Sequence, residues 1–142
     1  MGRILAIDYG LKRVGIAVTD TLQMIATPLE TVPTPTILEF IKQYAVTEII
    51  ECFVIGEPKK LDYTEADILP AIQIFAEKLQ TLYPDIPIEW QDERFTSSIA
   101  RKQLVTAGYK KNQRRDKTLI DKLSANIILS DFMIRTGKWQ LS

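Results

Sequence analysis

The sequence contains no histidine and only one cysteine, and these two shortages remove several classes of chemistry. Without histidine there is no Ser-His-Asp or Cys-His machinery, no histidine general base and no zinc site with His ligands. The single cysteine, Cys52, has no second cysteine in the chain with which to form a disulfide. Acid–base or metal chemistry must therefore rest on carboxylates, lysine, tyrosine or bound water. A site built from carboxylates suits a hard ion such as Mg²⁺ or Mn²⁺.

Long hydrophobic runs are also missing, and the first residues do not follow the pattern of a signal peptide. The chain has 142 residues, of which 46% are hydrophobic and 25% are charged, as in ordinary globular proteins. This length is enough to bury one hydrophobic core. We therefore expect a single domain over residues 1–142 that acts in the cytoplasm and does not bind a membrane.

Positive charge is concentrated in one segment, although the net charge of the chain is zero. Residues 94–117 contain eight basic residues and one acid, a net charge of +7, so the rest of the chain carries −7. Such a segment on an otherwise acidic protein favours an anionic partner that binds one face. The alternative is a solvated helix and loop without a partner.

Hydrophobic periodicity and turn residues predict five strands and four helices. The strands are expected at residues 3–9, 14–19, 25–32, 49–55 and 88–92, and the helices at 34–44, 67–82, 96–107 and 117–136. Thr34, followed by Pro35, is expected to cap the first helix. The first three strands should form an antiparallel meander, and the later alternation of strands and helices favours parallel fourth and fifth strands. The predicted fold class is α/β, with a mixed five-stranded sheet flanked by helices.

Carboxylates recur where this topology would collect them. Asp8 lies at the end of the first strand, Glu57 follows the fourth and Glu93 follows the fifth. Sheets of this kind bind ligands at the carboxyl ends of their parallel strands. Asp121 lies on the otherwise apolar, inward face of the last helix, where a carboxylate is costly unless it is paired, hydrogen-bonded or bound to metal. Asp8, Glu93 and Asp121 are therefore candidate catalytic residues and ligands of Mg²⁺ or Mn²⁺.

Each of these three acids also has a purely structural interpretation. Asp8 could accept hydrogen bonds from backbone amides of the turn at Gly10. Glu93 could pair with Arg94, and Asp121 could form a salt bridge with a nearby lysine or arginine. The functional interpretation is favoured because the topology brings all three acids to the same edge.

Basic residues are expected beside that edge, where they would bind phosphates. These candidate nucleic-acid-binding residues are Lys12, Arg13, Arg94, Arg101, Lys110, Lys111, Arg114 and Arg115. Carboxylates that hold a divalent ion among cations form the arrangement that cleaves a phosphodiester, because the ion activates water and stabilises the leaving oxygen. The surrounding cations bind the flanking phosphates.

Four stretches carry a resemblance to a known family: IDYGLKRVGIAVTD, FVIGEP, QDERFTS and KTLIDKLSANIIL. They resemble the YqgF-like family, whose members are described as Holliday-junction resolvases and as ribosomal-RNA maturation nucleases. The resemblance implies a ribonuclease H-like fold and metal-dependent nuclease chemistry with Asp8, Glu93 and Asp121 as ligands. It also implies that the target is the 5′ end of a small-subunit ribosomal RNA precursor. The segment GEPKKLDYTEAD departs from the family pattern, and Glu57 within it matches no family acid, so we expect a solvated loop acid there.

Several functions stay open. The protein could resolve a DNA four-way junction, which requires two symmetric cuts and hence favours a dimer, although an RNA precursor is the preferred partner. It could be a nucleic-acid-binding module without catalysis. A nucleotide-binding ATPase is disfavoured, because GLKRVGIA lacks the Lys-Ser/Thr of a P-loop. Oligomeric state and endonucleolytic or exonucleolytic action are not predicted.

Overall fold

The computed structural model describes residues 2–57, 68–92, 102, 106, 108 and 116–137. Its elements are β1 (Arg3–Tyr9), β2 (Arg13–Thr19), β3 (Ala26–Pro33), the 3₁₀ helix η1 (Thr34–Thr36), α1 (Ile37–Thr47), β4 (Ile50–Glu57), α2 (Ile68–Leu82), β5 (Ile88–Asp92) and α5 (Lys117–Arg135). Within the described part of the chain, no helix is long and apolar enough to cross a membrane.

The five strands form one mixed sheet in the order β3-β2-β1-β4-β5. β1 pairs with β2, and β2 with β3, in antiparallel fashion, whereas β1–β4 and β4–β5 are parallel. This arrangement confirms the predicted meander and the two parallel strands. Pro28 lies on the edge strand β3, where a residue without an N–H is tolerated.

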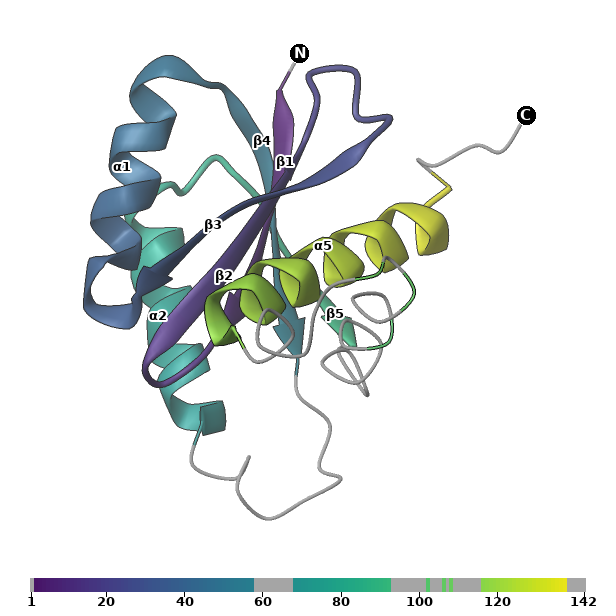
Figure 1. Ribbon diagram of the computed structural model, residues 1–142. Coiled ribbons are helices and arrows are strands. Elements are labelled where there is room, and N and C mark those ends of the chain that lie inside the picture. The colour runs from purple at the N-terminus through teal and green to yellow at the C-terminus, as the bar shows by residue number, and fades with distance from the viewer. Residues whose placement is uncertain are drawn as a thin grey trace.

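Helices cover both faces of the sheet, with α1 and α2 on one face and α5 on the other (Figure 1). Side chains alternate along β1, so that Leu5 and Ile7 pack in the core below α1 and α2, while Ile4 and Ala6 pack below α5. On α2 the buried residues are spaced three and four apart, which gives the helix one apolar stripe: Ile72, Phe75 and Leu79.

β2 presents different residues to the two layers. Its bulky residues Val14, Ile16 and Val18 pack in the core below α1 and α2. The alternating positions toward α5 carry small residues, including Gly15 and Ala17. The α5 layer therefore lies over a sheet surface that admits close approach.

The predicted cap at Thr34 is wrong. The chain forms the 3₁₀ helix η1 over Thr34–Thr36, and α1 begins only at Ile37. Instead of capping the helix, the Thr34 hydroxyl donates to the carbonyl oxygen of Gly10 at 2.7 Å, and the Thr34 N–H donates to the carbonyl oxygen of Lys12 at 3.0 Å. These bonds fasten the β1–β2 turn to the start of the first helix.

The bounds of the later helices agree better with those predicted from the sequence. α2 and α5 confirm the helices expected at residues 67–82 and 117–136 to within one residue at each end. The helix expected at 96–107 lies outside the described residues, apart from Lys102 and Thr106, which are helical.

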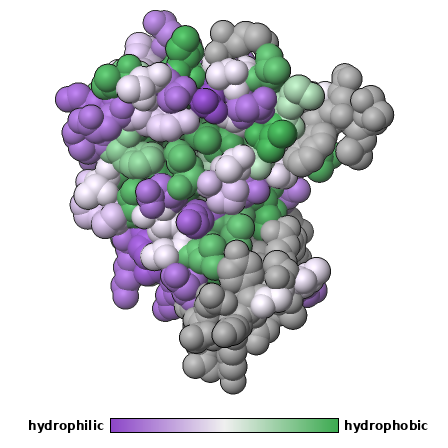
Figure 2. All heavy atoms as spheres, turned by 45° about the horizontal axis from the view of Figure 1, so that its top comes forward, coloured by the Kyte–Doolittle hydropathy of each residue, from purple (hydrophilic) through white to green (hydrophobic). Residues whose placement is uncertain are grey.

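Exposed apolar side chains occur at the end of the sheet where β1 begins. The connection between β2 and β3 carries exposed Leu22, Met24 and Ile25, and Gln23 fastens it by donating from Nε2 to the carbonyl oxygen of Gly2 at 2.9 Å. Figure 2 brings this end of the molecule forward and shows hydrophobic surface among hydrophilic side chains. Asp8 lies at the opposite end of the sheet, where β1 ends.

Candidate functional site

Asp8 is the penultimate residue of β1, and its cross-strand partner on β2 is Gly15. Alternation along the strand places Asp8 on the same face as Ile4 and Ala6, whose side chains pack below α5. The Asp8 side chain is partly buried. The strand therefore presents this carboxylate at its carboxyl end, on the α5 face of the sheet.

Gly15 brings α5 down onto that face. A Cβ atom at Gly15 would lie 2.0 Å from the carbonyl oxygen of Asp121 and 2.4 Å from its carbonyl carbon, so the helix backbone rests directly on the strand. No other residue fits at this contact without a shift of the helix. Because Gly15 is the cross-strand partner of Asp8, the backbone of Asp121 lies over the hairpin that carries Asp8.

The side chain of Asp121 is held by Arg13, the first residue of β2. Arg13 donates from Nε to Oδ2 of Asp121 at 2.7 Å, and the two side chains are 33% and 24% exposed. Charge-assisted bonds of this length are among the stronger hydrogen bonds in proteins. The salt bridge considered for Asp121 from the sequence is therefore present, with an arginine that was predicted to bind nucleic acid.

The first turn of α5 is held by the capping residue Asp116 and by a hydrogen bond from β3. Oδ1 of Asp116 accepts from the backbone N–H of Thr118 at 3.0 Å and from its hydroxyl at 2.6 Å, and these bonds, the hydroxyl first, lower the pKa of Asp116. The hydroxyl of Thr31 on β3 donates to the carbonyl oxygen of Thr118 at 2.5 Å. These contacts fix the start of the helix that carries Asp121.

Ser124 lies one turn after Asp121, with its side chain 1% exposed. Among the described residues its Oγ has no hydrogen-bond partner. Leaving a buried hydroxyl unpaired costs free energy, commonly about 1–3 kcal/mol. Such a group marks a place where a water or another polar ligand would be stabilised.

The ends of β4 and β5 reach the same edge as the end of β1, because the three strands are parallel. Glu57 ends β4 and is in register with Asp92, the last residue of β5. Its place in the alternation, two residues after Ile55, puts Glu57 on the face covered by α1 and α2. Glu57 is thus separated by the sheet from Asp8 and Asp121.

Of the predicted site residues, the structure joins Asp121 to Arg13 directly, and Asp8 lies on β1 opposite Gly15, which contacts the backbone of Asp121. Lys12 lies exposed in the adjoining turn. The remaining predicted residues lie outside the described part of the chain: Glu93, Arg94, Arg101, Lys110, Lys111, Arg114 and Arg115. Within residues 2–57, 68–92 and 116–137, no group of three metal-ligating side chains is found. The described portion of the site therefore consists of two carboxylates and two cations.

Two features of this site were not predicted. The bond from Arg13 to Asp121 joins residues 108 positions apart, and nothing local in the sequence indicates it. The role of Gly15 could have been inferred from the small residues that alternate along residues 14–19, because such a surface is typical of close helix packing.

The comparisons with known proteins agree with this geometry. A family model described as "RuvX: Holliday junction resolvase" matches residues 2–135. The chain belongs to the RuvX family. A relative of this RuvX-family protein in Porphyromonas gingivalis is 50% identical over 133 residues, which cover 94% of this chain and 96% of the relative. A relative in Phocaeicola vulgatus is 47% identical over the same length and the same shares. Both relatives carry the name "Putative pre-16S rRNA nuclease".

Solved structures of RuvC from Thermus thermophilus share the fold of this RuvX-family protein. RuvC in complex with a Holliday junction substrate gives a TM-score of 0.56 at 18% identity, over 96% of this chain and 97% of RuvC. A second RuvC structure gives 0.52 at 16% identity, over 95% and 96%. This likeness, together with the strand order, shows a RuvC-like, ribonuclease H-like fold and confirms the predicted fold class.

Proposed function

We propose that this RuvX-family protein is a divalent-metal-dependent nuclease that matures the 5′ end of a small-subunit ribosomal RNA precursor in the cytoplasm. The observation that supports the proposal is the contact of Gly15 with the backbone of Asp121, because Gly15 is the cross-strand partner of Asp8. The names of the relatives in Porphyromonas gingivalis and Phocaeicola vulgatus support the choice of substrate.

The residues present fit a hard divalent ion. The donors offered by Asp8 and Asp121 are carboxylate oxygens, which Mg²⁺ and Mn²⁺ prefer. The buried hydroxyl of Ser124, which has no hydrogen-bond partner among the residues that the structure describes, adds a polar group that a bound water could satisfy. We infer that Asp8 and Asp121 hold the ion, with Glu93 as the third ligand on the strength of the family resemblance. An ion held there would activate water and stabilise the leaving oxygen of the phosphodiester.

The cations of the hairpin have separate tasks in this proposal. Arg13 orients the carboxylate of Asp121 through its Nε. A guanidinium has five N–H donors, so Arg13 can also bind a phosphate of the substrate. Lys12, exposed in the same turn, would bind the neighbouring phosphate as a point charge. The basic segment would bind further phosphates along the nucleic-acid strand, through Arg94, Arg101, Lys110, Lys111, Arg114 and Arg115.

Holliday-junction resolution is the second candidate, and the description of the matching family model favours it. Resolution requires paired cuts and therefore a dimer. Maturation of an RNA end needs one cut and places no such demand on the oligomeric state. The two candidates share the same carboxylates and differ in substrate.

A cleavage assay separates these functions. Labelled RNA and DNA single strands, duplexes, a ribosomal RNA precursor leader and a four-way junction are incubated with Mg²⁺, Mn²⁺ or EDTA, beside an Asp121→Asn protein. We expect metal-dependent cutting of the RNA leader by the wild type only. Preferred cutting of the junction would replace the RNA proposal by the DNA one. Absence of cutting on every substrate, with both proteins binding equally well, would leave a binding module without catalysis.

A further inference from the structure

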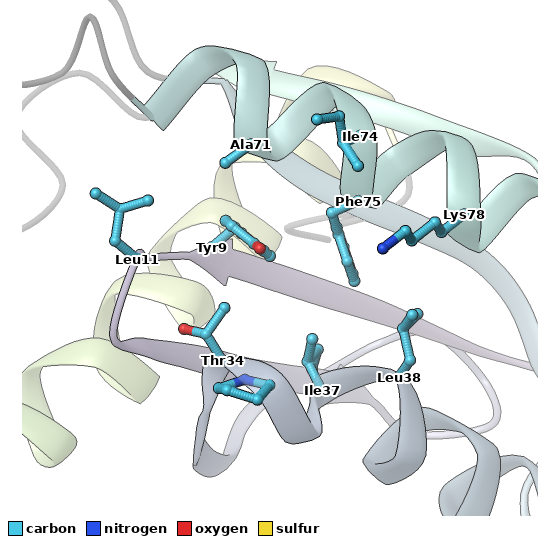
Figure 3. Close-up of a pocket in the computed structure, with 10 residues that line it drawn as sticks. Tyr9, Leu11, Thr34, Ile37, Leu38, Ala71, Ile74, Phe75 and Lys78 are labelled. Carbon is cyan, nitrogen blue, oxygen red and sulfur yellow. The ribbon is translucent and has the colours of Figure 1, made fainter.

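A second concave site lies on the face of the sheet away from Asp121. It is a cavity of about 350 Å³ at the end of β1, between the start of α1 and the middle of α2. Figure 3 shows Tyr9 at its base, Phe75 pointing into it from α2, and Lys78 directed back toward the two rings. Its size is that of pockets that hold small organic groups.

The lining combines aromatic surface with one cation. The rings of Tyr9 and Phe75 have centroids 4.9 Å apart and are tilted by 33°. Phe75 is 4% exposed, whereas Tyr9 is partly buried and Lys78 is exposed. Among the described residues that line the cavity, Lys78 is the only charged one. Burial raises the pKa of the Tyr9 hydroxyl, which therefore remains a hydrogen-bond donor at neutral pH.

The cavity is joined to the carboxylate site by the β1–β2 turn. Tyr9 follows Asp8 directly, and alternation directs the two side chains to opposite faces of the sheet. In the turn, Leu11 lines the cavity and is 59% exposed, whereas Arg13 contacts Asp121 on the other face. Lys12 lies exposed between them. A nucleic-acid strand that crosses this short turn would reach both the cavity and the carboxylate site.

We propose that the cavity takes one unstacked nucleotide of the substrate strand, with its base against the partly buried ring of Tyr9, which packs on Phe75, and its phosphate at Lys78. Aromatic side chains are the usual platform for unpaired bases. The positive charge of Lys78 suits a phosphate and no acidic side chain faces it among the described lining residues. The inference rests on the proposed function only for the identity of the nucleic acid that carries this nucleotide.

Binding measured in EDTA tests the inference without any need for cleavage. The probes are a short fluorescein-labelled single strand, followed by anisotropy, and adenosine 5′-monophosphate, followed through the NMR ring signals of Tyr9 and Phe75. Lys78→Gln removes the cation and Ala71→Phe fills the cavity from α2. Lys42→Gln is the matched control, because Lys42 is an exposed lysine of α1 that does not line the cavity.

We expect Ala71→Phe to weaken binding of the strand by about tenfold, the loss of one stacked base. Lys78→Gln should lower the slope of log K against log salt by about 0.7, the loss of one single-strand phosphate contact. Lys42→Gln should bind like the wild type. Thermal melts of the variants show that each remains folded.

Equal binding by all four proteins would overturn the inference and leave the nuclease proposal intact. Ring shifts with the mononucleotide, without any effect of Ala71→Phe or Lys78→Gln on the strand, would assign the cavity to a free nucleotide and overturn its assignment to the substrate. Weakened strand binding in both variants, with no cleavage under any metal condition, would support the cavity and overturn the nuclease.

Discussion

The bond between Arg13 and Asp121 gives one arginine two tasks. It places a positive charge against the carboxylate of Asp121, whose backbone rests on the cross-strand partner of Asp8. In the proposed site this charge would offset the repulsion between the two acids. It also fixes the direction of the Asp121 side chain, which a metal ligand requires. Both tasks arise from the position of Arg13 at the start of β2, on the same strand face as Gly15.

We expect Arg13→Gln to reduce cleavage strongly but to reduce stability little. The pair is partly exposed, with side chains 33% and 24% accessible, and such pairs contribute about 0.5 kcal/mol. The free energy of unfolding in urea and the single-turnover cleavage rate measure the two effects. Lys12→Gln, which removes the neighbouring charge, should leave stability unchanged. A loss of several kcal/mol in Arg13→Gln alone would show that the pair is chiefly structural.

How well single residues could be predicted depended on how local their signals were. Asp8 and Asp121 were predicted because a carboxylate in an apolar run, or on an apolar helix face, stands out in the sequence. Arg13 was not predicted as the partner of Asp121, because the contact joins residues 108 positions apart. Thr34 has the sequence context of a helix cap, yet its hydroxyl bonds to Gly10, 24 residues away, because the fold brings the hairpin turn there.

At the scale of elements, the distance between α5 and β2 decides the geometry of the site. Gly15 and Ala17 leave the strand without bulky side chains toward the helix, so the helix backbone touches the strand. Any side chain at Gly15 would move the whole first turn of α5.

We expect Gly15→Ala to destabilise the protein by about 3 kcal/mol, the upper part of the range for overpacking, because its Cβ would lie 2.0 Å from the carbonyl oxygen of Asp121. Cleavage should also be lost, since Asp121 would move away from Asp8. Urea unfolding gives the free energy. The control is Gly137→Ala, where φ is +74° and a Cβ meets nothing within 4 Å, so only the backbone conformation is penalised. Equal losses in the two variants would contradict the close contact.

The cap of α5 makes part of the stability depend on pH. The hydrogen bonds from Thr118 lower the pKa of Asp116 below its ordinary value of 3.8. A carboxyl whose folded-state pKa is depressed contributes stability above its unfolded pKa, and that contribution is lost as the pH falls through the folded-state pKa. The advantage of the wild type over Asp116→Ala in urea midpoint should therefore be full at pH 6 and shrink below pH 3.8.

Asp116→Asn serves as the comparison, because asparagine also caps helices but does not titrate in this range. Its midpoint should exceed that of Asp116→Ala at both pH values by a similar amount. An advantage of the wild type over Asp116→Ala that grows on acidification would contradict the direction of the pKa shift.

Element types were predictable where the pattern is strong and local. The alternation along residues 14–19 and the three- and four-residue spacing along α2 and α5 each describe one element without reference to the others. The start of α1 was misplaced, because η1 takes its hydrogen-bond partners from the hairpin turn. The cavity between α1 and α2 depends on how these helices pack, which no local pattern contains.

At the scale of the whole molecule, the sheet separates two potential substrate sites that the β1–β2 turn joins. α5 covers one face of the sheet, and α1 and α2 cover the other (Figure 1). Asp121 lies on α5, whereas the aromatic cavity lies between α1 and α2. The charge of the chain is divided as well, with +7 over residues 94–117 and −7 over the rest. Repulsion by the acidic remainder would direct a polyanion to the basic part.

This charge division predicts strong salt dependence of nucleic-acid binding. A double variant Arg114→Gln/Arg115→Gln should lower the slope of log K against log salt by about 1.4 for a single strand, the loss of two phosphate contacts. Anisotropy titrations at several salt concentrations measure the slope. Lys42→Gln, which removes one exposed positive charge on α1, is the control. An unchanged slope in the double variant would show that these arginines do not meet the strand.

Binding of Mn²⁺, followed by electron paramagnetic resonance, tests the central claim most directly. The wild type is titrated beside Asp8→Asn and beside Asp85→Asn, which removes an exposed carboxylate before β5, at the opposite edge of the sheet. We predict that the wild type and Asp85→Asn bind Mn²⁺ alike and that Asp8→Asn binds at least about tenfold more weakly, because a direct ligand is lost. Equal binding by Asp8→Asn and the wild type would contradict a metal centre at Asp8 and Asp121.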